Sequence, residues 1–467
     1  MKTIFLRLFI LIGLAAGSSD VRAQSSFAAD GWNSLDSIVA RIVPPEFPDR
    51  EFDVEKYGAV GDGKTVNTAA IRRAISECNQ AGGGRVVIPK GTFRTGPIHL
   101  LSNVNLHLRA GAVLQFSTNP QDYLPVVYTR WEGVECMNYS PLIYAFEQEN
   151  IAITGSGVLD GQGSNDNWWS WKGNKADGWK EGMPNQKEAR KKLFTMAEKG
   201  VPVKQRMFGE GSYLRPNFVQ PYRCKNILIE GVTFRNSPMW FIHPVLSSNI
   251  TVRNVRVEGL GPNNDGCNPE SSRDVLIQNC YFDTGDDCIA IKSGRNNDGR
   301  RVNISSENIV IRGCHMKEGH GGVVIGSEIS GSVRNVFAED CVMDSPNLDR
   351  AIRIKTNSVR GGVIENVFVR NIRVGQVSEA VLKINYFYEE GDGGAFTPVV
   401  RNISMLDVTC AKGPYAIWIK AYERSPVENL LLQNCRFEGI KEANVMEAVK
   451  GLTLKNVTIN GKTIGNQ

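Results

Sequence analysis

Three aspartates in the middle of the chain are the residues whose types and spacing best suit chemistry. Asp286 and Asp287 are adjacent, and Asp265 precedes Asp286 by 21 residues. Carboxylates held close together repel one another and lose hydration, so a chain tends to keep three of them together only where their chemistry is used. Two carboxyl groups of different pKa can serve as a general acid and a general base. The three aspartates therefore predict acid and base catalysis.

Cationic side chains follow the aspartates along the chain. His320 comes first, and Arg353 and Lys355 come next. Arg353 and Lys355 are two residues apart, so on a strand they would share a face. Cations close to acidic catalysts indicate an anionic substrate, and the set as a whole predicts acid/base hydrolysis of an acidic sugar polymer. A structural role for His320, which lies between two glycines, remains the alternative.

These residues lie within a repeat that predicts short strands. Its first copy is Asn226-Ile-Leu-Ile-Glu-Gly-Val-Thr-Phe234, and further copies begin at Asn249, Asp274, Asn308, Asn335, Asn366, Asn402, Asn429 and Gly451. The second and fourth positions are aliphatic almost throughout, which is the period of two expected of a strand. The seventh and ninth positions are apolar again. Even-numbered positions of the copy therefore face inward in its first half and odd-numbered positions in its second half.

The sixth position of each copy supplies the bend that such a change requires. It is Gly, Asn or Asp in every copy, and these residues most readily tolerate a left-handed backbone. Copies begin 22 to 36 residues apart, so a basic coil carries insertions of varied length. Stacked coils with strands about 4.8 Å apart form a parallel β-helix. The predicted fold is all-β, a single-stranded right-handed parallel β-helix.

The first half of the chain joins the same stack less regularly. Strand-like segments begin at Arg85, Asn103 and Asn150, and residues 69–76 form a predicted helix that Asn67 and Thr68 would cap. This short helix could cover the open N-terminal end of the solenoid, where an exposed coil would otherwise invite edge pairing.

The ten cysteines do not predict disulfides, although the protein is expected to be exported. Cys280, Cys314, Cys341 and Cys435 all occupy the seventh position of the repeat, where other copies have Val or Ile. They are best interpreted as small apolar residues of an interior ladder. Their spacing lacks the CxxC pattern of a zinc site, so neither a metal nor another cofactor is predicted.

The repeat also places the candidate catalytic residues. Asp286 and His320 each lie twelve residues after the start of a copy, so they should share a face on successive coils. Neighbouring residues of a regular strand point to opposite sides, so Asp286 and Asp287 can both reach solvent only if the backbone bends there. Gly285 makes a bend possible; without it one aspartate would be buried and would need hydrogen-bond partners.

The N-terminal segment and the net charge of the chain indicate where the protein acts and which partners it lacks. Lys2 and Arg7, an apolar stretch and Val21-Arg22-Ala23 predict a signal peptide over residues 1–23, with a buried N-terminal helix as the alternative. Residues 24–50 would form an extension and 51–467 the catalytic β-helix. Without residues 1–23 the formal charge is +3, too small to indicate nucleic acid. The mature protein is expected in the periplasm or outside the cell and not in a membrane.

One large insertion, at about residues 164–219, interrupts the repeats. It carries four tryptophans, and residues 172–206 have ten Lys or Arg against four Asp or Glu. A helix is predicted at about residues 185–199. The insertion is either a solvated surface loop or a wall over the cleft that recruits a polyanion.

Four short motifs give the chain a family resemblance. Asn263-Asn-Asp-Gly266, Gly285-Asp-Asp-Cys288, Gly319-His-Gly321 and Arg353-Ile-Lys355 resemble, in order, the signature motifs of glycoside hydrolase family 28, the polygalacturonases and their relatives. The segment Asp53–Asp62 also resembles the entry segment of β-helical pectin enzymes. The resemblance covers the chain from about residue 50 onward and implies a solenoid like that of pectin lyase.

The resemblance implies a role for each residue in an inverting hydrolysis of pectin. Asp286 would protonate the glycosidic oxygen, and Asp265 and Asp287 would hold and deprotonate the attacking water. The acid and the base of such an inverting pair would be separated by roughly 6.5 to 9.5 Å, which leaves room for that water. His320 would tune the acid. Substrate-binding candidates are Arg353 and Lys355 for a uronate carboxylate, Asn263 of the first motif, and Tyr386 or Tyr388 for stacking, although either tyrosine could equally be packing.

The expected activity is that of an exo-acting polygalacturonase or galacturonidase on an acidic plant cell-wall polysaccharide. The basic insertion favours a cleft closed at one end. Asn264 and Asn268 stand where many relatives have other residues, so a rhamnogalacturonan hydrolase of the same family remains an alternative. Two further functions would suit the same solenoid: an eliminating enzyme of the pectate-lyase type, usually dependent on calcium, and a non-catalytic glycan-binding β-helix.

Overall fold

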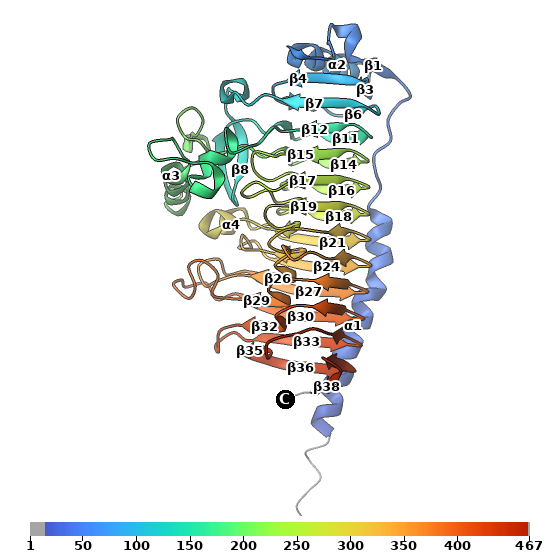
Figure 1. The fold of residues 1–467 in the computed structure, drawn as a ribbon, viewed down its shortest axis with the longest axis vertical. Coiled ribbons are helices and arrows are strands. Elements are labelled where there is room, and N and C mark those ends of the chain that lie inside the picture. The colour runs from blue at the N-terminus through green and yellow to red at the C-terminus, as the bar shows by residue number, and fades with distance from the viewer. Residues whose placement is uncertain (1–14, 466–467) are drawn as a thin grey trace, which may run out of the picture.

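The protein is a long solenoid of stacked parallel strands (Figure 1). The structure is a computed structural model that describes residues 15–465, with side chains from residue 27 onward. The predicted signal peptide, residues 1–23, falls mostly outside the described part of the chain. Three long faces of the solenoid are sheets whose strands pair in parallel, apart from the antiparallel pair of β37 and β38 at the C-terminal end, which confirms the predicted right-handed parallel β-helix.

The sheets are formed as follows. The 13-stranded sheet contains, in spatial order, β1 (Glu51–Asp53), β3 (Gly84–Ile88), β6 (Val104–Leu108), β11 (Glu149–Gly155), β14 (Lys225–Glu230), β16 (Ser248–Arg253), β18 (Arg273–Gln278), β21 (Ser306–Arg312), β24 (Val333–Glu339), β27 (Val363–Arg370), β30 (Val399–Leu406), β33 (Val427–Gln433) and β36 (Val449–Lys455). The 14-stranded sheet contains β2 (Asp62–Val66), β4 (Gly91–Thr95), β7 (Ala112–Phe116), β12 (Val158–Asp160), β15 (Thr233–Arg235), β17 (Arg256–Gly259), β19 (Tyr281–Thr284), β22 (His315–Met316), β25 (Val342–Met343), β28 (Arg373–Gln376), β31 (Thr409–Lys412), β34 (Arg436–Phe437), β37 (Val457–Ile459) and β38 (Lys462–Ile464). The third face has a six-stranded sheet, β20 (Ile289–Ile291), β23 (Val323–Ile325), β26 (Arg350–Lys355), β29 (Ala380–Asn385), β32 (Tyr415–Lys420) and β35 (Val445–Glu447), and a three-stranded one, β13 (Val219–Tyr222), β10 (Ile143–Phe146) and β5 (Ile98–His99). A separate hairpin pairs β8 (Val127–Trp131) with β9 (Val134–Asn138).

Helices are few and lie outside the stack. The α-helices are α1 (Ala15–Arg41), α2 (Thr68–Gln80), α3 (Lys187–Glu198) and α4 (Asn296–Val302). The 3-10 helices are η1 (Val54–Tyr57), η2 (Pro120–Tyr123), η3 (Trp168–Lys172), η4 (Lys175–Asp177) and η5 (Val203–Gln205). Among residues 15–465 no helix combines the length and the apolar character that a membrane crossing requires.

Each copy of the repeat forms two strands that meet at a corner. In the copy that starts at Asp274, β18 ends at Gln278 and β19 begins at Tyr281, and Asn279 between them has φ 53°. The residues before and after the corner that were predicted to face inward are buried. The first position of the copy also has a positive φ, as at Asn335 (54°), so each coil bends at both ends of its first strand.

The first positions form a ladder of amide hydrogen bonds along the 13-stranded sheet. Asn335 Nδ2 donates to Asn308 Oδ1 at 3.1 Å, and Asn366 Nδ2 donates to Asn335 Oδ1 at 3.0 Å. The ladder continues through Asn402 and Asn429. Each amide therefore ties its own coil to both neighbours.

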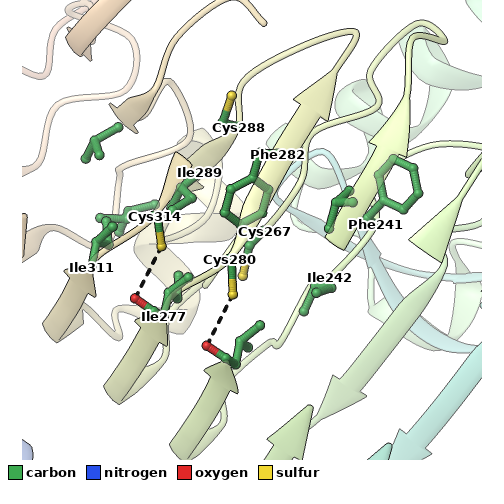
Figure 2. Packing of buried hydrophobic residues seen from close by; sticks show 14 of the residues in the cluster. Phe241, Ile242, Cys267, Ile277, Cys280, Phe282, Cys288, Ile289, Ile311 and Cys314 are labelled. Atoms are coloured by element: carbon green, nitrogen blue, oxygen red, sulfur yellow. Dashed lines mark hydrogen bonds between the residues drawn. The ribbon is translucent and has the colours of Figure 1, made fainter. Parts of the chain in front are cut away.

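The four cysteines at the seventh position of the repeat lie inside the stack, as predicted. All ten are free and buried. Cys280 and Cys314 pack beside Phe282 and Ile311 in the core, and their sulfurs lie 3.6 Å from backbone carbonyl oxygens (Figure 2). They fill the positions that Val or Ile fills in other coils.

Two helices cover apolar surface that the stack leaves open. α2 caps the N-terminal end with Ile71, Ala74 and Ile75 buried, although Asn67 makes no side-chain cap bond and instead bonds to Val60. α1 runs along the outside of the 13-stranded sheet (Figure 1). The apolar side chains of α1 that pack there, among them Leu35 and Ile38, form an amphipathic face that the sequence analysis did not predict.

The insertion folds over one side of the solenoid. It includes α3, which lies where a helix was predicted, and it projects from the stack beside the β8–β9 hairpin (Figure 1). Buried ionic and apolar contacts anchor it: Arg206 Nη1 lies 2.7 Å from Asp298 Oδ1 of α4, and Leu193 packs with Trp131 of the hairpin. The insertion is therefore packed against the rest of the protein and is not a solvated loop.

Candidate active site

A cavity of about 250 Å³ contains the predicted catalytic residues. The three aspartates, His320, Arg353 and Lys355 all line it. The remaining lining residues are Glu132, Lys172, Arg190, Trp240, Asn263, Lys292, Ser327, Glu328, Tyr388 and Glu389. None of the three aspartates faces the apolar interior, so the chain bends after Gly285 as the prediction required.

Two glycines allow the coils to approach closely beside the aspartates. A β-carbon at Gly285 would lie 2.3 Å from the carbonyl oxygen of Gly261, and one at Gly319 would lie 2.4 Å from the carbonyl oxygen of Asp286. Gly319 also has φ 147°. These close approaches explain why the motifs place glycine next to Asp286 and His320.

Asp286 is paired with His320. Its Oδ1 lies 3.0 Å from His320 Nδ1, and its side chain is 18% exposed, so it remains accessible to a ligand. Burial acts to raise the pKa of Asp286, but the hydrogen bond and charge of His320, with Lys355 and Lys292, outweigh burial and lower it. The hydrogen bond to Asp286 raises the pKa of His320 above its ordinary value.

Asp287 is held by the two predicted substrate-binding cations. Lys355 Nζ lies 2.6 Å from its Oδ2, and Arg353 Nη1 lies 3.2 Å from its Oδ1. Asp287 is 1% exposed, so without these partners its charge would be costly. Arg353 and Lys355 thus orient Asp287 and line the cavity at the same time.

Asp265 has partners that the sequence analysis did not assign. Asn268 Nδ2 donates to its Oδ2 at 3.0 Å, and Lys292 Nζ lies 3.5 Å from the same atom. Lys292 also contacts Glu328 at 3.2 Å and lies 4.6 Å from the ring centroid of Trp240. The second carboxylate oxygen of Asp265, Oδ1, is buried without a hydrogen-bond partner among the described residues.

The carboxyl groups of Asp265 and Asp286 differ in proton affinity. Burial, and next the charge of Asp286, raise the pKa of Asp265 well above its usual range despite Lys292. The pKa values of Asp265 and Asp286 are therefore shifted in opposite directions, and closely coupled carboxyls titrate as a pair.

The carboxylates are closer together than the sequence analysis expected. One oxygen of each lies within 4.8 Å of the others, below the roughly 6.5 to 9.5 Å usual for an inverting pair. A water at ordinary hydrogen-bond distance, about 2.8 Å, from two oxygens can still bridge that separation. Carboxylates at this spacing could also hold a cation, but Lys292, Lys355 and Arg353 already lie against two of them.

The two candidate tyrosines have different positions. Tyr386 is fully buried in the core, so the prediction that it could stack on a sugar is wrong for this residue. Tyr386 continues the inward alternation of Leu382 and Ile384 in β29, and the chain turns only after it. Tyr388 lines the cavity, and its ring centroid lies 5.2 Å from Lys355 Nζ.

The insertion and the hairpin provide one side of the cavity. Lys172 Nζ lies 2.6 Å from Asn263 Oδ1, and Asn263 Nδ2 lies 3.4 Å from Asp286 Oδ2. Arg190 Nε lies 2.6 Å from Glu132 Oε2. The excess of basic residues left open whether the insertion is a solvated loop or a wall, and only the fold shows that Lys172, Arg190 and Glu132 line the cavity.

A parallel β-helix with carboxyl groups and cations in one cavity defines an enzyme that acts on an acidic polysaccharide. Residues 210–457 match glycosyl hydrolases family 28, and residues 52–112 match a family described as rhamnogalacturonase A/epimerase, pectate lyase-like. The chain therefore belongs to glycosyl hydrolases family 28 and is a glycoside hydrolase.

Individual relatives agree with this family. A probable polygalacturonase of Vitis vinifera is 30% identical over 81% of this chain and 72% of its own, and an exo-poly-alpha-D-galacturonosidase of Dickeya chrysanthemi is 27% identical over 97% and 81%. The crystal structure of a hyperthermoactive exopolygalacturonase from Thermotoga maritima is 48% identical, covers 93% of this chain and 97% of its own, and superposes with a TM-score of 0.90.

Proposed function

We propose that this protein is an exo-acting polygalacturonase that hydrolyses galacturonic-acid linkages in pectin. The observation that carries the proposal is the cavity, which the insertion and hairpin bound on one side through Glu132, Lys172 and Arg190. We infer that the end of a substrate chain meets this wall. The names of the Dickeya and Thermotoga relatives support the same activity.

The proposed roles follow the contacts in the cavity. Asp286 is the general acid, because it is the most accessible of the three and has His320 as a proton partner. Asp265 and Asp287 hold and deprotonate the attacking water between them. Arg353 and Lys355 receive a uronate carboxylate beside the reacting bond, and Asn263 and Tyr388 line the remaining space.

The proposed site of action is outside the cytoplasm, in the periplasm or beyond the cell, on plant cell-wall pectin. The apolar N-terminal stretch with its flanking basic residues supports export. A precursor longer than the exported protein by about residues 1–23 would be the expected observation, measured by mass spectrometry of the intact secreted chain.

A product time course tests the activity. Purified protein is incubated with polygalacturonate and, separately, with rhamnogalacturonan oligomers, with Asp286→Asn as the inactive control. An exo enzyme releases one short product from the start; a ladder of intermediate oligomers would contradict exo action, and cleavage of rhamnogalacturonan alone would contradict the substrate.

The products of the same reaction show whether the anomeric carbon is inverted and whether the bond is cleaved by hydrolysis or by elimination. Direct attack by water inverts the anomeric carbon, so NMR of the first product should show the opposite anomer to the substrate linkage. Retention would contradict a direct water attack. An unsaturated, ultraviolet-absorbing product that disappears with a chelator would instead indicate an eliminating enzyme.

A further inference from the structure

A row of polar and aromatic side chains extends from the active site toward the C-terminal end of the solenoid. β26, β29 and β32 pair in register, with Arg353 opposite Lys383 and Lys383 opposite Trp418. A second line joins Lys355, Asn385 and Lys420. The distal row, as we name it, consists of Lys383, Asn385, Trp418 and Lys420.

The distal row faces outward. The alternating residues Ile352, Ile354, Leu382, Ile384, Ile417 and Ile419 are buried in the core. Because side chains alternate along a strand, the distal row shares the outer face with Arg353 and Lys355. The exposed side-chain fraction rises along this face, from 7% at Lys355 to 14% at Lys383 and 38% at Lys420, so the surface opens away from the cavity.

The chemistry of the distal row matches an acidic sugar chain. Lys383 Nζ lies 4.3 Å from the ring centroid of Trp418, and Lys420 Nζ lies 5.6 Å from it. Ammonium groups beside a partly buried indole offer a charge for a carboxylate next to an apolar face for a sugar ring. Coils are about 4.8 Å apart, so such groups recur at regular intervals along the stack.

The ion pairs already present leave these ammonium groups available. Lys420 pairs with Glu447 at 2.9 Å, but Glu447 is 54% exposed and the pair is solvated and weak. Lys383 pairs with Glu379, which also contacts Arg350 and so keeps a cation when Lys383 turns to a ligand.

We propose that the distal row is a binding subsite for the part of a galacturonate chain that lies beyond the cleaved bond. Lys383 and Lys420 receive uronate carboxylates, and Trp418 receives the face of a sugar ring. This inference rests on the proposed function. It adds that affinity and turnover depend on chain length through residues one and two coils away from Arg353 and Lys355.

The test compares chain lengths within each variant. kcat/KM is measured for oligogalacturonates from the shortest that the wild type cleaves up to a heptamer, for wild type, Trp418→Ala, Lys420→Ala and the control Lys450→Ala. Lys450 is an exposed lysine of β36 in the 13-stranded sheet, away from the distal row. Thermal unfolding of each variant verifies its fold.

We expect the ratio of kcat/KM for long to short oligomers to fall about tenfold in Trp418→Ala and several-fold in Lys420→Ala, equivalent to about 1.4 kcal/mol for the larger effect. Lys450→Ala should keep the wild-type ratio. An active protein whose ratio is the same in all four forms would overturn the distal row and leave the proposed function intact.

Calorimetric binding of heptagalacturonate separates the two proposals if the protein cleaves no oligomer. Affinity that falls in Trp418→Ala but not in Lys450→Ala would support the distal row and contradict the proposed hydrolysis. Affinity that is equal in all forms, or no binding at all, would overturn the distal row.

Discussion

Asp265 and Asp286 share one cavity, yet their pKa values are shifted in opposite directions because their partners differ. Asp286 has the His320 hydrogen bond, whereas Asp265 is deeply buried and has one carboxylate oxygen without a partner among the described residues. Acid and base work by neighbouring carboxyls uses a difference in pKa, and the proposed roles require the bound substrate to reverse the direction found here so that Asp286 carries the proton. The protonation of this pair can therefore be followed by titration.

The first prediction concerns His320. Its hydrogen bond to Asp286 raises its pKa, so the imidazole should stay protonated above its ordinary value of about 6.5. Its charge and the stability it contributes are complete below the unfolded pKa and are lost as pH rises through the folded pKa. NMR titration of the His320 ring should show this, while His107, whose pKa burial lowers, should titrate lower.

The pH dependence of activity should also depend on His320. The alkaline limb of kcat/KM should lie above pH 6.5 in the wild type, because the Asp286 and His320 pair then loses its shared proton. In His320→Asn the limb should move to lower pH, since only carboxyl groups remain to hold the proton. An unchanged limb would show that His320 has no part in proton supply.

The second prediction concerns Lys292. Lys292→Met removes the cation beside Asp265, so the pKa of Asp265 should rise further and the ionised base should exist only at higher pH. The acidic limb of kcat should therefore move to higher pH, with kcat reduced about tenfold or more and KM nearly unchanged. The loss of a buried partner should also lower the free energy of unfolding by about 3 kcal/mol.

Lys317→Met is the matched control for Lys292→Met. Lys317 is 44% exposed and pairs with Asp283 on the outer surface, so its loss should change neither the pH profile nor stability measurably. If Lys292→Met loses stability but keeps the wild-type pH limbs, Lys292 is structural only.

At the scale of the elements, the asparagine ladder defines where each coil bends. Asn335 donates one amide hydrogen bond, accepts another and has a left-handed backbone at φ 54°. The ladder therefore combines a conformational requirement with bonds between neighbouring coils, and the two contributions can be measured separately.

The third prediction makes that separation. Asn335→Gly keeps the backbone conformation and loses both hydrogen bonds, which should reduce the free energy of unfolding by about 1 to 2 kcal/mol. Asn335→Ala also leaves in the left-handed region a side chain that, unlike Asn, cannot stabilise that conformation by local hydrogen bonding, at a further cost of about 1 kcal/mol. Urea denaturation should therefore rank wild type above Gly above Ala; equal stability of the two variants would contradict the conformational contribution.

At the scale of the whole molecule, one core runs through the stack and α1 ties the coils together from outside. The helix contacts Leu276, Val310, Phe337 and Phe368, which come from four successive coils of the 13-stranded sheet. The insertion bridges the coils around the active site in a similar way. Stability thus comes from side-chain packing and not from covalent cross-links.

The fourth prediction tests this for the cysteines. All ten thiols are buried and free, and burial raises the pKa of those such as Cys288, so they should be unreactive in the native protein. A thiol reagent should detect few thiols in native protein and ten after denaturation. The midpoint of thermal unfolding should be the same with and without a reductant; a lower midpoint with reductant would reveal a disulfide.

The sequence by itself determined the solenoid, the interior cysteines and the line of residues Asp265, Asp286, His320, Arg353 and Lys355. Strand alternation and corner residues are local properties, and a repeat of similar length returns equivalent positions to the same face. These features can be derived without knowledge of distant contacts.

Only the tertiary structure decided which other residues share the cavity. Lys292 and Glu328 come from strands and turns that carry no motif, and Lys172 and Arg190 reach the site from an insertion whose path no period describes. Tyr386 and Tyr388 have the same parity, yet one lies in the core and the other in the cavity because the chain turns between them. Contacts of this kind depend on packing between segments far apart in the chain, which local pattern does not encode.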